Sequence, residues 1–301
     1  MKTFLSCLAV TFTLTLLPAH AESFKEMFPE DYGLLSAEEQ ARADKMALQT
    51  GKISIDGGRA EVTIPDDYYF LGAEDSAYVI VDIWGNPSAE GTLGMIFPAA
   101  HSPYGSGWGV EMSFEEMGYV SDGDADGYDY DDLLRQMQRD TKQSSKEREA
   151  QGYGSVALLG WAEPPHYDKS ERKLYWAKRL QFGDVDGETL NYNIRVLGRH
   201  GVMVVNFIAG MDELESVRAA APEVMKMVSF AEGNRYADYV PGVDTVAAVG
   251  IGGLIAGKVA AKTGLLVLLL AFAKKFIFLL LIPVAILWQK VKSFFSGGRH
   301  S

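Results

Sequence analysis

The sequence predicts an α+β domain with an antiparallel sheet and flanking helices, followed by a C-terminal transmembrane helix or helical hairpin. Apolar runs rich in β-branched and aromatic residues recur between residues 52 and 210, with Gly and Pro between them. Helical patterns stand apart from these runs, over residues 35–51, 132–152 and 212–230. Strands that follow one another, with helices set apart, are typical of α+β domains.

The N-terminus predicts a secretory signal peptide over residues 1–21. Lys2 supplies a short positive region, "FLSCLAVTFTLTLLP" is apolar, and "AHA" offers small residues around a cleavage point. The single cysteine, Cys7, lies inside this segment. The mature chain would therefore contain no cysteine, which excludes disulfides, thiolate metal sites and cysteine nucleophiles.

The globular domain is expected over residues 22–242, and its first elements follow in order. "LSAEEQARADKMALQTG" predicts a helix with a capping box of Ser36 and Glu39, ended by Gly51. "KISIDGGRAEVTIP" predicts two short strands around an Asp-Gly-Gly turn at residues 56–58. "AYVIVDIWG", "GTLGMIFPA" and "GWGVEMSF" are further apolar runs that we interpret as strands.

The second half of the domain predicts a polar surface helix, two strand pairs and a last helix. Residues 132–152 form the polar helix, and the strand pair of residues 155–183 places Leu174, Trp176, Lys178 and Leu180 on one face. A hairpin over residues 190–210 turns at "GRHG". Residues 212–230 carry a buried helical stripe, and Pro222 is expected to begin a second short helix there.

The C-terminus predicts a hydrophobic membrane anchor over residues 243–290 and a short basic tail over residues 291–301. A span needs roughly 20 apolar residues, but Lys258, Lys262, Lys274 and Lys275 interrupt this segment. Both a single long tilted span and a hairpin or re-entrant pair stay open. The basic tail favours a cytoplasmic end and an odd number of crossings.

Small residues recur at four-residue spacing in the anchor, at Gly253, Gly257 and Ala261. Such a smooth face lets a second helix approach closely, which predicts packing against a copy of the chain or another helix. The alternative is that small residues are simply common in membrane helices.

The charge of the chain is divided between its parts. The whole carries −12, residues 1–21 carry +1 and residues 243–301 carry +6, so residues 22–242 carry −19. This excess argues against nucleic acid as a partner, since phosphate binding needs clustered Lys and Arg. It is compatible with cations, basic proteins or neutral ligands.

The segment "SDGDADGYDYDDLL" begins like a calcium-binding EF-hand loop, with Asp122, Asp124 and Asp126 before a glycine. The twelfth position should be a bidentate glutamate, and here it is Leu133. The alternative is an acidic helix start, in which carboxylates from residue 129 onward satisfy free N–H groups. We favour the acidic cap and keep calcium as the alternative.

The segment "GWAEPPHYD" gathers Glu163, His166 and Asp168 among aromatic residues. One hypothesis is a pocket with carboxylate–imidazole acid–base chemistry. The other, which we favour, is a stiff connection between two strands, held by Pro164–Pro165 with the option of a cis bond. Elsewhere His101 and His200 stand alone in turns, where solvated histidines are common, and no phosphate loop, H-E-x-x-H or nucleophile elbow occurs.

Four segments resemble one bacterial family: "GYGSVALLGWAEPPHYDKSERKLYWAKRL", "LNYNIRVLGRHGVMVVNFIA", "EGNRYADY" and "VAAVGIGGLIAGKVAAKTGLL". The chain resembles domain-of-unknown-function family 2167 over about residues 30–285. The resemblance implies an exported domain with a C-terminal hydrophobic anchor and transfers no catalytic residue. The late strands and "PEVMKMVSF" are also similar to small sandwiches of the photosystem-subunit P and Mog1 type.

We therefore expect a membrane-anchored periplasmic protein of the bacterial cell envelope, with its anchor in the inner membrane and a non-enzymatic binding or scaffolding role. Its partners would be the lipid bilayer and an envelope protein or a second copy of the chain. Two alternatives stay open. One is an envelope hydrolase or carbohydrate-acting enzyme that uses Glu163, His166 and Asp168, and the other is a weak calcium-binding module.

Overall fold

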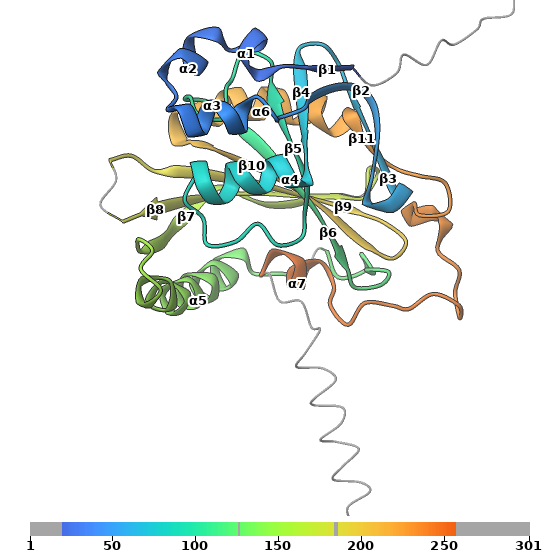
Figure 1. Cartoon of the computed structure of the whole chain (residues 1–301). Coiled ribbons are helices and arrows are strands. Elements are labelled where there is room, and N and C mark those ends of the chain that lie inside the picture. The colour runs from blue at the N-terminus through green and yellow to red at the C-terminus, as the bar shows by residue number, and fades with distance from the viewer. Residues whose placement is uncertain (1–19, 126, 184–185, 257–301) are drawn as a thin grey trace, which may run out of the picture.

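The computed structural model describes residues 20–125, 127–183 and 186–256 (Figure 1). Most of the predicted signal peptide and most of the predicted anchor lie outside these residues, as do Asp126, Gly257 and Ala261. Among the described residues, no helix has both the length and the apolar content to cross a membrane.

An antiparallel sheet forms the centre of the molecule, as the sequence predicts, and it has eleven strands in the described part of the chain. Its strands run in the order β11-β3-β2-β4-β5-β6-β10-β9-β8-β7, and β1 pairs with β2. The strands are β1 (His20–Glu22), β2 (Leu48–Ile55), β3 (Ala60–Ile64), β4 (Tyr68–Gly72), β5 (Thr92–Pro98), β6 (Gly109–Glu116), β7 (Val156–Asp168), β8 (Lys173–Phe182), β9 (Thr189–Leu197), β10 (Gly201–Gly210) and β11 (Val228–Phe230).

Helices flank this sheet on both sides (Figure 1). They are α1 (Phe24–Met27), α2 (Pro29–Leu34), α3 (Ala37–Ala43), α4 (Ala73–Tyr78), α5 (Tyr130–Ala150), α6 (Leu214–Met227) and α7 (Ile251–Ile255). The predicted polar surface helix is confirmed as α5, in which Ser145 is the one buried residue.

The largest core lies between α6 and one face of the sheet. Val217, Ala221 and Val224 project from α6 at spacings of three and four, which fits the predicted stripe. They pack on alternating strand residues such as Ile194 and Phe207. We call this side of the sheet the α6 face.

The opposite face carries two smaller apolar clusters. One joins α1, α3 and α4 to β4 and β5, with Phe24, Tyr69 and Phe97 at its centre. The other joins α5 and α7 to β8 and β9 around Trp176 and Leu197. Between the two clusters the face is polar, and this division positions the candidate site.

Three local predictions are wrong. The helix that begins at Ser36 has the predicted capping box but ends at Ala43, because residues from Leu48 pair with β1 and β3 instead. The run "AYVIVDIWG" is helical: α4 continues as a π-helix (Val79–Ile83), since a short apolar run does not separate a strand from a buried helix. Pro222 lies inside the continuous helix α6, whose stripe packs on the sheet across the proline.

The chain beyond residue 242 packs on the domain as far as it is described. Asp244 accepts two hydrogen bonds from the Arg199 guanidinium, at 2.8 and 2.9 Å. Tyr119 exchanges backbone hydrogen bonds of 2.8 Å with Thr245 and Ala247. Helix α7 buries Ile251 and Leu254 in the cluster around Trp176. The first part of the predicted anchor segment is thus integrated into the domain.

Candidate functional site

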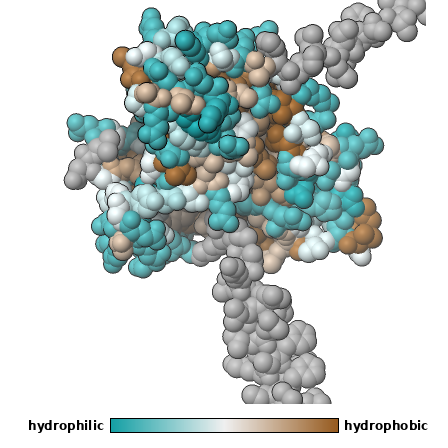
Figure 2. All heavy atoms as spheres, in the orientation of Figure 1, coloured by the Kyte–Doolittle hydropathy of each residue, from teal (hydrophilic) through white to brown (hydrophobic). Residues whose placement is uncertain are grey.

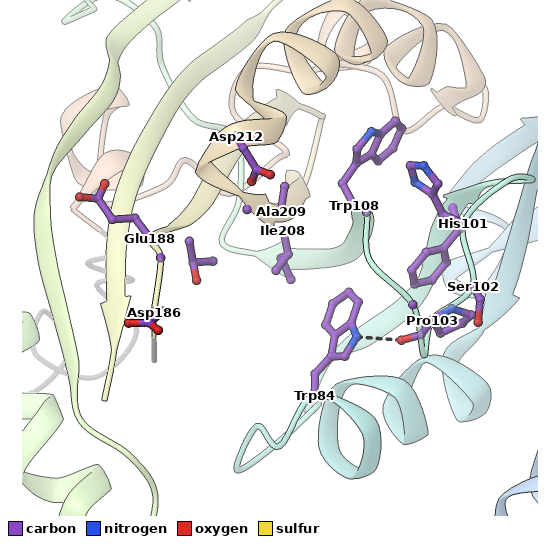
Figure 3. Close-up of a pocket in the computed structure, with 16 residues that line it drawn as sticks. Trp84, His101, Ser102, Pro103, Trp108, Asp186, Glu188, Ile208, Ala209 and Asp212 are labelled. Carbon is purple, nitrogen blue, oxygen red and sulfur yellow. Dashed lines mark hydrogen bonds between the residues drawn. The ribbon is translucent and has the colours of Figure 1, made fainter. Parts of the chain in front are cut away.

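A cavity of about 390 Å³ lies where the end of β10 and the start of β9 face the turn after α4 (Figure 3). Its walls come from the π-helix end at Trp84, the loop between β5 and β6, and the short turn Met211–Glu213. This volume falls in the range of roughly 300–1,000 Å³ typical of small-molecule sites.

Two indole rings form the aromatic part of the cavity wall. Trp108 donates from Nε1 to the Ser216 Oγ at 3.1 Å, and its ring packs 5.5 Å from that of Phe207. Trp84 donates from Nε1 to the Pro103 carbonyl at 3.1 Å. Because both indole N–H groups are satisfied by the protein, the rings are fixed in place. Trp108 is only 4% exposed, so of the two rings the half-buried Trp84 offers the apolar surface to a ligand.

His101 is held edge-on to Trp108, with ring centroids 6.1 Å apart. A Cβ at Gly107 would lie 2.5 Å from the imidazole, and the φ of Gly107 is +126°, so this position requires glycine. The buried His101 Nδ1 has no hydrogen-bond partner among the described residues. His101 is therefore part of the cavity wall, and the expectation of a solvated histidine is wrong.

Carboxylates give the cavity its polarity. Glu188 points away from the cavity centre (Figure 3), and Arg179 donates to it at 2.7 and 2.8 Å. Asp212 is exposed at the rim and has no hydrogen-bond or ion-pair partner in the described parts of the chain. Asp186 is also exposed at the rim. The net field of the cavity is therefore negative.

Polar side chains continue from the cavity across the sheet, on the face opposite α6. We call these residues the polar strip: Lys178, Asn191, Asn193, Arg195, Asn206 and Glu111. Asn191 stands directly opposite Ile208, which lines the cavity, and opposite Lys178 on the other side. Directly opposite residues share a face of the sheet, so the strip starts at the cavity wall.

The amides of the strip bond to one another. Asn191 Nδ2 donates to Asn206 Oδ1 at 2.6 Å, and Asn193 Nδ2 donates to the Asn191 carbonyl at 2.8 Å. These bonds satisfy the buried Asn193 and fix the orientation of the neighbouring amides.

The two cations of the strip lack ion-pair partners within the described residues. Arg195 is 9% exposed, its Nε is buried without an acceptor, and its guanidinium lies 5.0 Å from the Trp176 ring centroid. Lys178 is half-buried, and burial together with the nearby Arg195 lowers the pKa of Lys178 to about 8.

This depressed pKa predicts how stability changes with pH. Between about pH 8 and 10.5 the unfolded chain binds the Lys178 proton more tightly than the folded chain, so the free energy of unfolding rises with pH. At pH 7 the buried charge costs stability, and Lys178→Met should raise the free energy of unfolding by about 1–3 kcal/mol. Urea unfolding of both proteins at pH 7 and pH 10 measures this difference, which should shrink at the higher pH. A variant no more stable than the wild type at pH 7 would contradict the prediction.

The residues of "GWAEPPHYD" all lie on β7, and the structure gives each a separate environment. Glu163 is paired with Arg218 of α6. The exposed His166 stacks on Tyr175, with ring centroids 4.9 Å apart. Asp168 caps the β7–β8 turn, accepting from Ser170 N and Glu171 N at 2.8 and 3.1 Å. His166 and Asp168 line one cavity of about 360 Å³, and the acid–base hypothesis for these three residues stays a prediction.

The prolines of this segment do not form a connection between strands. Pro164–Pro165 lie inside β7 at an irregularity in the register between Glu163 and His166, and the described chain contains no cis peptide bond. Because β7 is the last strand of the sheet, prolines that lack an N–H are tolerated there. The expected stiff connection is therefore wrong.

The acidic segment before α5 acts as a cap, as favoured. Asp129 accepts from the backbone N–H groups of Asp131 and Asp132, at 2.9 and 3.0 Å.

Asp124 accepts from Tyr128 and from the backbone N–H of Ile251. Asp122 accepts from three side chains, namely those of Tyr167, Arg172 and Tyr236. In the described parts of the chain, no three His, Cys, Asp or Glu side chains are grouped to hold a metal ion.

Gly253 is the one member of the predicted helix-packing face inside the described residues. It lies in α7, where an added Cβ would approach the Val249 side chain to 2.6 Å. Gly257 and Ala261 lie outside, so the predicted packing against a second helix stays a prediction.

The cavity residues could not be found from their order in the sequence, because Trp84, His101, Trp108 and Asp212 come from four separate segments. Lys178 had a detectable pattern. It alternates with Leu174 and Trp176 on one face of a strand. A charged residue in such an apolar series indicates a partly buried charge, which costs free energy unless it is paired.

The fold and cavity together define an α+β protein with a ligand-sized site on an antiparallel sheet. The chain belongs to the family described as "Protein of unknown function (DUF2167)", whose model matches residues 47–285. No curated protein matches the chain.

The solved structures that are weakly similar to this one include two of different types. One is the solution structure of cyanobacterial PsbP (CyanoP) from Synechocystis, with 9% identity, 60% of this chain and 91% of that chain covered, and a TM-score of 0.36. The other is the Ran-binding protein Mog1p of Saccharomyces cerevisiae, with 10% identity, 61% and 96% covered, and a TM-score of 0.29. Both types match the expected fold analogies, but at these scores they carry no argument about function.

Proposed function

We propose that the chain is a membrane-tethered domain of the bacterial cell envelope that binds a small ligand with a positively charged group, without catalysing a reaction. The observation that carries the binding function is the cavity that is lined both by the fixed indole ring of Trp84 and by the unpaired carboxylate of Asp212. A cation over an indole ring is attracted by the ring quadrupole, and a carboxylate adds Coulomb attraction.

The charge of the domain supports the same class of ligand. Residues 22–242 carry −19, so the field around the cavity attracts cations and repels free anions. The sequence patterns of residues 1–21 and 243–290 support export and tethering, since they are typical of a signal peptide and a hydrophobic anchor.

The test uses hexylamine as a probe and the full-length chain in detergent micelles. We expect Asp212→Asn to weaken hexylamine binding roughly fivefold, because an exposed ion pair contributes up to about 1 kcal/mol. Ligand-detected NMR titration measures the affinity. Glu213→Gln is the matched control, since Glu213 belongs to the same turn but does not line the cavity. Equal affinities for wild type and Asp212→Asn, or no binding at all, would refute the proposal.

A further inference from the structure

The polar strip has an excess of hydrogen-bond donors. Lys178 carries three N–H donors and no acceptor, and no ion pair or hydrogen bond joins it to another described residue. Arg195 Nε and Trp176 Nε1 are buried donors that also lack an acceptor there. Lys178 thus has no anion of the described chain beside it, whereas Arg195 interacts electrostatically with Glu115 and Glu111 of β6.

The carboxyl groups of Glu111 and Glu115 lie near Arg195 and form no ion pair with Lys178 among the described residues. Glu111 lies opposite Asn206 on β6 and interacts electrostatically with Arg195, but it forms no ion pair with either cation of the strip among the described residues. Burial raises the pKa of Glu111. A half-buried cation without a counter-ion, as Lys178 is, reduces stability, and such a cost is typical of a binding function.

Lys178 is close enough to the cavity to act on the same ligand. Ile208 lines the cavity on β10, Asn191 is opposite it on β9, and Lys178 is opposite Asn191 on β8. Two strand spacings, roughly 10 Å, therefore separate the cavity wall from the lysine backbone. The ammonium group projects from the same face of the sheet.

We infer that the ligand is zwitterionic, with its positive group in the cavity lined by Trp84 and Asp212 and a carboxylate bound by Lys178 on the polar strip. This inference rests on the proposed binding function and specifies its ligand class. The cavity alone selects a cation, and the strip adds selection for a compound that also carries a carboxylate at a distance from its amine.

Three matched probes test the inference on the full-length chain in detergent micelles: hexylamine, ε-aminocaproate and hexanoate. They share a linear carbon chain and differ in whether they carry the amine, the carboxylate or both. We expect ε-aminocaproate to bind about tenfold more tightly than hexylamine, and hexanoate to bind more weakly than either, because a charge-assisted contact adds about one factor of ten.

Lys178→Met should abolish the advantage of ε-aminocaproate without weakening the binding of hexylamine, since it removes a positive charge, whereas Asp212→Asn should weaken the binding of both amines. Lys169→Met is the control, since Lys169 is exposed in the β7–β8 turn. Circular dichroism melting checks that each variant folds. If ε-aminocaproate binds no better than hexylamine, or keeps its advantage in Lys178→Met, the inference is wrong, while Asp212-dependent hexylamine binding would still support the proposed function. If no amine binds, both the inference and the proposed function are wrong.

Discussion

Phe207→Ala should lower the free energy of unfolding by about 3–5 kcal/mol, as expected when a large buried ring is removed and leaves a cavity. Phe207 is fully buried in β10, with its ring 5.5 Å from Trp108 and 6.0 Å from Tyr192. This loss is a large share of the roughly 5–15 kcal/mol that stabilises a typical domain. Urea unfolding followed by tryptophan fluorescence measures it.

Leu34→Ala is the control for that experiment, because Leu34 is 86% exposed and its replacement should change stability by no more than about 0.5 kcal/mol. The loss of unfolding free energy in Phe207→Leu should lie between the losses in Leu34→Ala and Phe207→Ala. A loss below about 1 kcal/mol for Phe207→Ala would mean that the ring is not packed as described. Since Phe207 supports Trp108, hexylamine binding should weaken in the same variant at temperatures where it remains folded.

Deletion of residues 257–301 should move the protein from the membrane fraction to the soluble fraction, because this segment holds the long apolar runs of the chain. The deletion keeps α7, which buries Ile251 and Leu254 against the domain. The melting temperature of the domain should therefore stay close to that of the full chain. Fractionation after a carbonate wash, followed by thermal melting, measures both quantities.

A longer deletion of residues 243–301 separates tethering from folding. It should also be soluble, but it removes Asp244 from Arg199 and uncovers the cluster around Trp176 and Leu197. Its melting temperature should be clearly lower. Persistence of the shorter deletion in washed membranes would show that residues 257–301 are not the tether.

The periodic elements were predictable from the sequence. The hairpin of β9 and β10 follows from the alternation of apolar and polar residues, and the surface helix α5 follows from its polar composition. Both signals are local in the sequence. The capping box of Ser36 and Glu39 is likewise local, since its partners lie three residues apart. The family resemblance rests on residue order and needed no structure.

The remaining features, namely the helical run after β4, the cavity and the pKa of Lys178, depend on the tertiary structure. The run "AYVIVDIWG" is helical because its buried residues pack on β5, and local periodicity does not contain that information. Trp84, His101, Trp108 and Asp212 share a cavity because the sheet brings four distant segments together. The pKa of Lys178 is lowered by burial and by Arg195, and both depend on the register of β8 against β9. The sequence by itself determined the strongly periodic elements and the family, whereas the short apolar runs and the chemistry of the candidate site depend on long-range pairing.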